Sequence, residues 1–303
     1  MIAFKPITLA DKAAYEEKLL VCGQRGCEFS FANLYLWGRQ KLAFLDGQAL
    51  LFSQFNRRTV YPFPVGCGDK KAAIDAIMHD SQVRGIPCRI TGITPENRAS
   101  LEALYPGRFR FHGDRDSFDY VYSIDDLADL TGRKYQKKRN HFNRFRTLYP
   151  YYTVAPLSEA NLPGVQAMLD SWFATRQAAD PSGDFHMERS ALRKALAHYQ
   201  ELGMEALVLL DGDQVLAFTM ASPLSADTMD VHFEKARPGA EEAYPVINCE
   251  FARFLRQKLP HIRYLNREED MGIEGLRKAK ESYYPHHLVE KCWACLLEDG
   301  YDY

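Results

Sequence analysis

The chain has 303 residues, of which 46% are hydrophobic and 26% are charged, and its formal net charge is −2. This length allows two domains or one large one, and the composition is typical of a soluble globular protein. The net charge excludes a protein that binds nucleic acid through its overall charge, so any basic binding surface must be local.

Nothing in the sequence indicates export, membrane insertion or a metal site. Residues 1–6 lack the apolar core of a signal peptide, and no apolar run approaches the roughly 18 residues that span a bilayer. Seven cysteines, an odd number, indicate free thiols in a reducing compartment. Cys292 and Cys295 have the spacing of a redox or zinc pair, but they lie in an expected strand, where positions three apart point to opposite faces. We expect a cytoplasmic protein with buried structural thiols and no metal.

In the first half of the chain, capping and turn signals mark where helices and strands begin. Thr8 and Asp11 form a helix start, Asp46-Gly47 is a strong hairpin signal, and Thr94-Pro95 is a cap followed by proline. The expected elements are helices at 8–20 and 28–37, strands at 41–45, 48–53 and 59–63, a helix at 69–79, a strand at 88–91, a helix from 94 and a strand at 118–123.

The second half repeats this order. Its expected elements are helices at 158–173 and 188–202, strands at 206–210 and 214–221, a strand at 228–234, a helix at 244–258, a strand beginning at 262, a further helix and a last strand at 287–297. The two hairpin turns are 165 residues apart, and sequence identity between the halves is negligible. This order is that of the GNAT acyltransferase fold. We therefore expect an α/β (α+β) protein of tandem GNAT-like domains, each with a mixed sheet flanked by helices. The expected domains are 1–124, a basic connecting helix at 125–150, and 151–303.

One stretch of the second half, residues 262–285, carries the densest functional signal. A short strand ends at Arg267-Glu-Glu-Asp270, and a helix follows, with Ile273, Leu276, Ala279 and Tyr283 forming its apolar stripe. In open α/β sheets, ligands bind where strands end and helices begin. A charged loop held by its own ion pairs is the alternative interpretation.

A second signal is the basic run between the halves, residues 131–146. It carries seven positive charges, and the next acidic residue is Glu159. Tyr135, Phe142 and Phe145 share one helix face, so the segment can dock through its aromatic rings and present its basic side. Such a local excess attracts polyanions, although a solvated helix face is the alternative. The expected phosphate- or RNA-binding residues are Lys134, Lys137, Lys138, Arg139, Asn140, Asn143 and Arg144.

Three segments together resemble the phosphatidylglycerol lysyltransferase C-terminal domain family. They are Phe118 to Leu127 running into Gly132 to Asn143, Glu234 to Asn248, and Tyr264-Leu-Asn-Arg-Glu-Glu-Asp-Met-Gly-Ile-Glu-Gly-Leu-Arg-Lys-Ala-Lys280. The resemblance covers nearly the whole chain. It implies tandem GNAT-like folds related to Fem-type peptidyltransferases. It also implies transfer of an amino acid from aminoacyl-tRNA, in characterised members to a lipid hydroxyl.

The residues of the second half are suited to this chemistry. Transfer from an ester needs a carboxylate, to hold the ammonium group of the donor or to take the proton of the acceptor, and a donor that polarises the carbonyl. We expect Glu268, Asp270, Arg267 and Glu234 to be catalytic. The expected substrate-binding residues are Asn248, Asn266, Glu269, Glu274 and Lys278.

The sequence disfavours acetyl-CoA as the donor. GNAT enzymes hold pyrophosphate on a glycine-rich turn that opens a helix. The corresponding turn here, 235–243, contains Pro238, which lacks an amide hydrogen, and Glu241 and Glu242, which would repel phosphate.

We therefore expect an aminoacyl-tRNA-dependent aminoacyltransferase that needs no cofactor. Its expected partners are tRNA and, through peripheral contact, a membrane lipid as one possible acceptor. A CoA-dependent N-acyltransferase of the GNAT class, or a non-enzymatic module that binds RNA or phosphate, is the alternative. The amino acid, the acceptor and the oligomeric state stay open.

Overall fold

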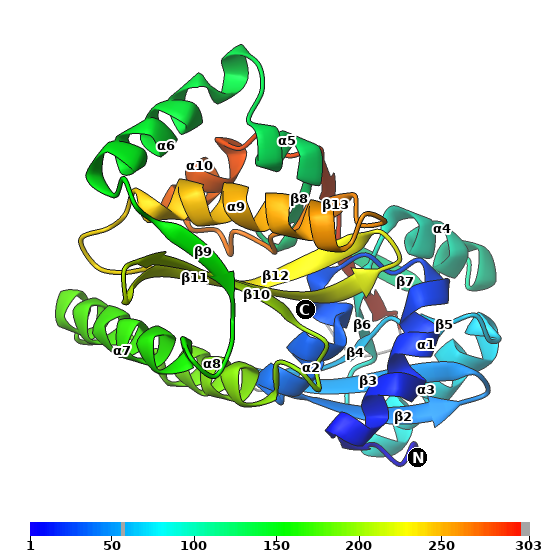
Figure 1. Cartoon of the computed structure of the whole chain (residues 1–303). Coiled ribbons are helices and arrows are strands. Elements are labelled where there is room, and N and C mark those ends of the chain that lie inside the picture. Colours follow the sequence, from blue (N-terminus) through cyan, green and yellow to red (C-terminus); the bar gives the residue numbers. More distant parts are fainter. Residues whose placement is uncertain (56–57, 298–303) are drawn as a thin grey trace. The chain divides into compact units, whose positions relative to one another are not determined.

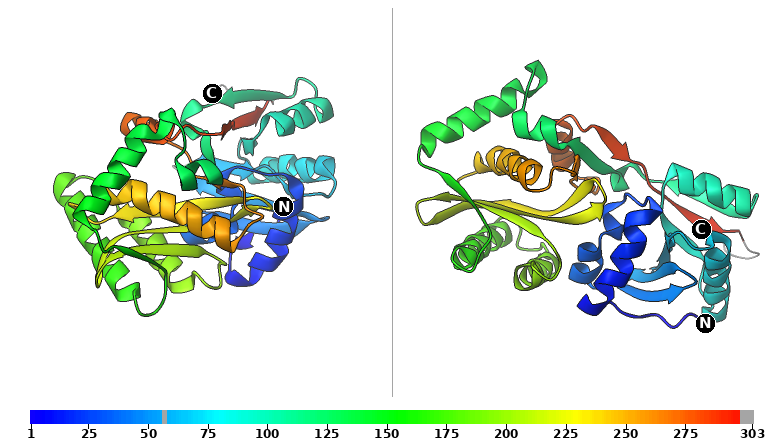
Figure 2. Two further views of the ribbon diagram at one scale, coloured as in Figure 1. Left: turned by 45° about the horizontal axis from the view of Figure 1, so that its top comes forward. Right: turned by 45° about the vertical axis from the view of Figure 1, so that its right-hand side comes forward.

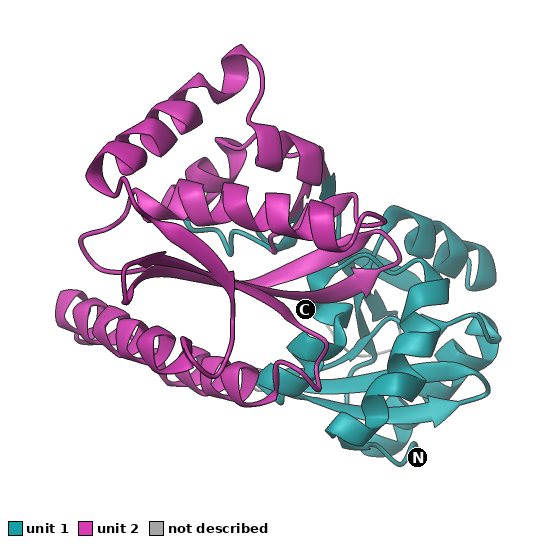
Figure 3. Cartoon of the chain, viewed as in Figure 1, with its two compact units in different colours: residues 1–119, 269–274, 288–303 teal, residues 120–268, 275–287 magenta. Residues whose placement is uncertain are grey.

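The computed structural model describes residues 1–55 and 58–297, which form two compact units (Figure 3). The first unit contains Met1–Asp119, Glu269–Glu274 and the chain from Leu288 onward. The second contains Tyr120–Glu268 and Gly275–His287. The chain therefore passes from one unit to the other after Asp119, Glu268, Glu274 and His287. The sequence boundaries near 124 and 150 stay a prediction about domains; the compact units have other bounds.

The first unit begins with a capped helical segment, as Thr8 and Asp11 predict. Both halves of the capping box are present, and a 3₁₀ turn, η1 (Leu9–Asp11), leads into α1. Its helices and helical turns are α1 (Lys12–Cys22), η2 (Cys27–Phe29), α2 (Phe31–Trp37), α3 (Lys70–Arg84), α4 (Pro95–Leu104) and η3 (Arg115–Ser117). Its strands are β1 (Lys5–Pro6), β2 (Gln40–Leu45), β3 (Gln48–Phe55), β4 (Arg58–Pro62), β5 (Val65–Gly66), β6 (Arg89–Ile93), β7 (Phe109–Gly113) and β15 (Cys292–Leu296).

The sheet of the first unit is mixed. Its order is β1-β2-β3-β4-β6-β15-β7, with β5 paired to β3, and β4 and β6 run parallel. The hairpin predicted at Asp46-Gly47 joins β2 to β3 and is confirmed, and both turn residues have positive φ (44° and 79°). The strand β7 was not predicted, since the expected elements include no strand at 109–113.

The second unit contains a sheet with helices on both faces. Its helices and helical turns are α5 (Ile124–Asp129), η4 (Arg133–Tyr135), α6 (Gln136–Leu148), α7 (Leu162–Ala179), α8 (His186–His198), α9 (Ala243–Lys258) and α10 (Glu274–Glu281). The strands of this sheet are β8 (Asp119–Ser123), β9 (Thr153–Pro156), β10 (Glu205–Asp211), β11 (Gln214–Ser225), β12 (Thr228–Ala236), β13 (Tyr264–Asn266) and β14 (His287–Val289), of which Asp119, Leu288 and Val289 are counted with the first unit. The order is β14-β8-β13-β12-β11-β10-β9, with β12 and β13 parallel.

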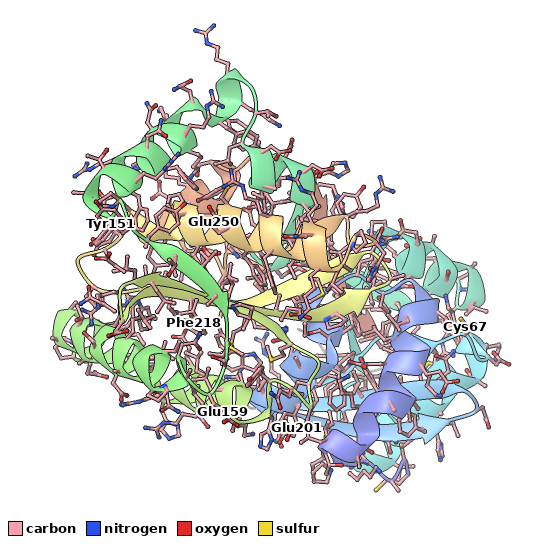
Figure 4. The ribbon with its side chains drawn as sticks, in the orientation of Figure 1. Cys67, Tyr151, Glu159, Glu201, Phe218 and Glu250 are labelled. Atoms are coloured by element: carbon pink, nitrogen blue, oxygen red, sulfur yellow. The ribbon has the colours of Figure 1, made fainter. Side chains whose placement is uncertain are left out.

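Helices α7 and α8 cover one face of this sheet and α9 covers the other (Figures 1 and 2). Phe218 of β11, labelled in Figure 4, is fully buried on the α7 side. The hairpin predicted at residues 211–213 joins β10 to β11 and is confirmed. Each unit thus has a mixed sheet flanked by helices, which confirms the predicted fold class.

Two strands do not lie where their order in the sequence suggests. The sequence analysis ends the first half with the strand at 118–123, but β8 pairs with β13 in the second unit's sheet. The expected last strand, 287–297, is two strands, of which β14 joins the second unit's sheet and β15 lies between β6 and β7. Strand patterns show which residues alternate between faces, but not which strand is the partner. The local sequence therefore does not reveal that β8 joins the sheet of the second unit and β15 that of the first.

The aromatic face of the basic segment is confirmed. Tyr135 and Phe145 are fully buried, and Phe142 packs against a cluster of Leu130, Tyr135 and Cys249. The stripe predicted for the helix after residue 270 is partly wrong, because Ile273 is 53% exposed and α10 buries Lys280 instead. In the described part of the chain, no helix is both long and apolar enough to cross a bilayer.

Candidate active site

The centre of the candidate site is an ion pair between neighbouring strands of the second unit. Glu234 lies near the carboxyl end of β12, and Arg267 directly follows β13. Arg267 Nη2 donates a hydrogen bond of 2.8 Å to Glu234 Oε1, and both side chains are at least 85% buried. Asn248 of α9 donates from Nδ2 to Glu234 Oε2 at 3.2 Å. Two predicted catalytic residues and one predicted binding residue therefore meet.

Aromatic rings and a second cation flank this pair. The guanidinium of Arg267 lies 5.1 Å from the ring centre of Tyr283 and 5.6 Å from that of Tyr122. Lys138 of α6 places its Nζ 3.6 Å from the centre of the Tyr283 ring and donates to Ser282 Oγ at 2.7 Å. Burial, together with the charge of Arg267, lowers the pKa of Lys138 to about 8, although Glu234 acts in the opposite direction. Lys138 is thus close to changing its charge at neutral pH.

Two buried polar atoms of this group lack a hydrogen-bond partner. Arg267 Nη1, a donor, and Asn248 Oδ1, an acceptor, have no hydrogen-bond partner within the described residues. An unsatisfied buried polar group costs about 1–3 kcal/mol, and such atoms are uncommon in folded proteins. A carbonyl oxygen could accept from Arg267, and an ammonium group could donate to Asn248.

Glu268 belongs to a neighbouring cluster on the same strands. Met220 of β11 pairs with Phe233 and Ala221 pairs with Val231, so His232 is the extra residue of a β-bulge in β12. His232 Nε2 lies 2.8 Å from Ser222 Oγ. Its Nδ1 lies 3.5 Å from a carboxylate oxygen of Asp230 and 3.5 Å from one of Glu268.

The backbone after β13 directs Glu268 to this cluster. Glu268 has a left-handed φ of 57°, and its N–H donates to Asn266 Oδ1 at 2.8 Å. Lys280 donates to the carbonyl oxygens of Arg267 and Glu268. The fully buried Asn266 therefore holds the turn that separates Arg267 from Glu268.

Glu269 and Asp270 belong to the first unit, where each contacts a basic side chain. Glu269 contacts the buried Lys291 at 3.2 Å, and Asp119 contacts the same Nζ at 2.7 Å. Burial opposes the charge on Lys291, yet Asp119 and the other acidic groups around it raise its pKa well above the ordinary value. Asp270 is fully buried, with an oxygen 3.6 Å from Arg115 Nη1.

The remaining predicted binding residues are exposed. Glu274 begins α10 and Lys278 lies one turn later on its surface. Their predicted role in substrate binding stays a prediction.

The predicted phosphate-binding residues point in different directions. Lys138 turns inward, and Arg139 donates to the carbonyls of Leu130 and Gly132, at the start of the segment. Two more form ion pairs, Lys134 with Asp126 at 3.1 Å and Arg144 with Glu242 at 3.2 Å. Lys137, Asn140 and Asn143 are exposed on α6, as are Arg133 and Arg146 in the same segment. The outward charge is therefore smaller than the sequence count suggests.

A groove between α7 and α8 lies on the opposite face of the sheet from α9. Leucine side chains and the exposed pair Arg189–Asp170, 2.6 Å apart, line it. It lacks a buried, convergent set of polar groups, so we place the chemistry at Glu234 and Arg267 instead.

The chain matches a known protein family and several solved structures. A family model described as "Phosphatidylglycerol lysyltransferase, C-terminal" matches residues 21–295. The chain belongs to this family. A crystal structure of a conserved protein of unknown function from Bacteroides thetaiotaomicron VPI-5482 is 37% identical, with a TM-score of 0.92, and the match covers 98% of this chain and all of that one.

Other solved structures share the fold of this phosphatidylglycerol lysyltransferase-family chain. L-PGS from Bacillus licheniformis is 18% identical with a TM-score of 0.69, over 98% of this chain and 94% of that one. FemX is 11% identical with a TM-score of 0.61, over 98% of both chains. An uncharacterised protein from Mycoplasmoides gallisepticum is 22% identical over 58% of this chain, and the matched stretch spans 55% of that protein's length.

The family and the shared fold support a function of the acyltransferase or aminoacyltransferase type. The sequence analysis identified three members of the central group of this family member, Glu234, Arg267 and Asn248. The inward turn of Lys138 was not predicted, nor was the grouping of Glu268, itself a predicted catalytic residue, with Asp230 and His232. His232 lies in a strand where polar and apolar residues alternate, so nothing in the sequence marks it as special. Its position at a β-bulge depends on how β12 pairs with β11, which one strand alone does not show.

Proposed function

We propose that the protein is an aminoacyltransferase that takes an amino acid from aminoacyl-tRNA and passes it to a hydroxyl or amine acceptor. The observation that supports this most directly is the unsatisfied pair of buried atoms, Arg267 Nη1 and Asn248 Oδ1, on either side of Glu234. One donor and one acceptor beside a carboxylate match the carbonyl and the ammonium group of an aminoacyl ester.

In this proposal Glu234 and Asn248 hold the ammonium group of the donor. Arg267 donates to the carbonyl oxygen, where negative charge develops when the acceptor attacks. The rings of Tyr122 and Tyr283 limit water around this charge, so that the interaction with Arg267 is stronger than it would be in bulk solvent.

Lys138 is suited to the proton transfer. As the acceptor oxygen forms its bond to the carbonyl carbon, its proton passes to the neutral amine of Lys138. The ester bond then breaks, and the ribose oxygen of the tRNA leaves and takes up a proton. A base with a pKa of about 8 is well matched to this task near neutral pH.

The turn before α9 supports tRNA over acetyl-CoA as the donor. Glu241 accepts the N–H of Gly239 at 3.0 Å, and Glu242 directly precedes the helix. Both carboxylates thus occupy the place where a pyrophosphate would need free amides and positive potential. The family description makes the hydroxyl of phosphatidylglycerol the first acceptor to test.

The test is to incubate the protein with pools of tRNA that carry labelled amino acids and with phosphatidylglycerol vesicles, and to measure labelled lipid. Glu234→Gln and Arg267→Lys should each lower the rate by about 10²-fold or more, since the first removes the charge that positions the donor's ammonium group and the second weakens the donor that faces the developing oxyanion. Glu205→Gln is a matched control, because Glu205 forms a surface pair with Lys258 at 2.6 Å. Equal rates in the wild type and both site variants would overturn the proposal.

A further inference from the structure

The cluster around His232 contains a buried ring nitrogen that no hydrogen bond satisfies within the described residues. The side chain of His232 is 1% exposed, and its Nδ1 has no hydrogen-bond partner within the described residues. The carboxylates of Asp230, which is fully buried, and Glu268, which is 28% exposed, both face this atom at 3.5 Å.

Neither neutral form of the imidazole explains this arrangement. If Nδ1 carries the proton, a donor–acceptor distance of 3.5 Å is too long for a good hydrogen bond to either carboxylate. If Nε2 carries it and donates to Ser222 Oγ at 2.8 Å, the lone pair of Nδ1 points at two negative groups. The second form becomes favourable when a cation lies between the three ligand atoms.

The spacing of the three atoms suits a small divalent ion. Bonds of about 2.1 Å in tetrahedral geometry place two ligand atoms about 3.4 Å apart. The two distances from Nδ1 are both 3.5 Å, and the three ligand atoms lie within 4.8 Å of one another. The third distance is the one between the carboxylate oxygens of Asp230 and Glu268. Because Glu268 is the most exposed of the three residues, a small rotation of its side chain can adjust this distance.

The surroundings hold the ligands as metal sites usually do. A ligating histidine normally donates its other ring nitrogen to an orienting partner, and Ser222 provides one. Asn266 accepts the backbone N–H of Glu268, which fixes the turn that carries this ligand.

We propose that Asp230, His232 and Glu268 bind one divalent transition-metal ion of the zinc class, with the fourth position open to water. No metal was expected from the sequence, because no cluster of cysteines and histidines with metal-ligand spacing is present; Asp230 and His232 lie on β12, and Glu268 follows β13. This site goes beyond the proposed function, and metal binding tests it whatever the outcome of the transfer assay.

The experiment measures metal bound to the whole chain. After chelation and dialysis against Zn²⁺, the wild type should retain one zinc per chain by elemental analysis, and Zn²⁺ should raise its melting temperature. His232→Ala and Glu268→Gln should each lower the retained zinc at least tenfold. His198→Ala is the control, since His198 forms an exposed pair with Glu201 at 3.3 Å, and this variant should bind zinc as the wild type does.

Cobalt(II) provides an independent readout, because four-coordinate cobalt has intense visible absorption that the wild type should show and Glu268→Gln should lose. Circular dichroism verifies that each variant is folded. Two results would overturn the proposal: the same zinc content in the wild type and in Glu268→Gln, or nitrogen-15 spectra in which both nitrogens of His232 stay protonated with Zn²⁺ present.

Discussion

Two cations share the ring of Tyr283, with Lys138 at 3.6 Å and Arg267 at 5.1 Å from its centre. The ring attracts both, but burial and the neighbouring guanidinium favour the neutral form of the lysine. Glu234 stabilises Arg267 directly, through the 2.8 Å hydrogen bond, and acts on Lys138 only through its charge. The pKa of Lys138 is therefore lowered and that of Arg267 is raised, although the two side chains lie against the same ring.

This difference predicts how the transfer reaction depends on pH. Because the pKa of Lys138 is about 8, kcat/KM should rise with pH and level off above that value. Lys138→Arg should remove this step and lower the rate, since a guanidinium stays protonated. Lys134→Arg, at a surface pair with Asp126, should keep the wild-type profile. An unchanged profile in Lys138→Arg would show that another group takes the proton.

The same residue contributes to stability with a defined sign. The pKa of Lys138 is lower in the folded chain than its ordinary value of 10.5, so the unfolded chain binds more protons between pH 8 and 10.5. The free energy of unfolding should therefore rise with pH across this window, and Lys138→Met should remove this rise. Urea unfolding at several pH values measures it.

At the scale of single elements, α6 illustrates why charge counted along a sequence overstates a binding surface. Its segment has seven basic residues, but Lys138 faces the candidate site and Arg139 caps carbonyls. Lys134 and Arg144 are paired with acidic groups. Arg133, Lys137 and Arg146 are exposed and take part in none of these contacts, so they are the first candidates for contact with a polyanion.

We predict that these three exposed residues carry most of the salt dependence of tRNA binding. Each phosphate contact contributes about 0.7–0.9 to the slope of log affinity against log salt, so changing all three to Gln should flatten it by roughly 2 to 3. The control changes the same number of exposed charges on α7 and α8: Arg176, Arg193 and Lys194. Filter binding across a salt series measures both. An equal slope change in the control triple would mean that α6 has no special role.

The elements themselves were largely predictable. Helix caps and turn residues act locally, so Thr94-Pro95 and both hairpins lie where the sequence indicates. The site was predictable only in part. The ion pair between Glu234 and Arg267 joins residues at the carboxyl ends of neighbouring parallel strands, an arrangement that the fold class already suggests. The separation of Glu268 from Arg267 depends on one left-handed residue, and nothing in the composition of that turn indicates it.

At the scale of the whole molecule, the exchange of β8 and β15 determines which pieces of the chain can fold alone. A fragment of residues 120–289 contains the sheet of the second unit, because β8 lies between β14 and β13. A fragment of residues 151–303, the domain expected from the sequence, contains β9 but lacks β8, and with it the strand between β14 and β13. A fragment of residues 1–124 lacks β15, which joins β7 to β6.

We therefore predict that 120–289 unfolds cooperatively in urea, whereas 151–303 does not. The shorter first fragment, 1–124, should show the same loss of cooperativity, and adding a peptide of residues 288–297 should restore part of it. Circular dichroism and amide chemical-shift dispersion measure the outcome. A cooperative transition in 151–303 would support the sequence boundaries instead.

The position of β15 also sets the order of events during synthesis. Cys292 follows Gly113, the end of β7, by 179 residues, so at roughly 5–20 residues per second the first sheet stays incomplete for roughly 9 to 36 s. Throughout that interval, the edges of β6 and β7 that later pair with β15 are unpaired and can form hydrogen bonds with strands of other chains. The ribosome thus delivers the last piece of the first sheet after the second unit has been made. A chain that terminates before β15 would keep an incomplete first sheet with unpaired edges. Such a chain is a natural substrate for chaperones and proteases.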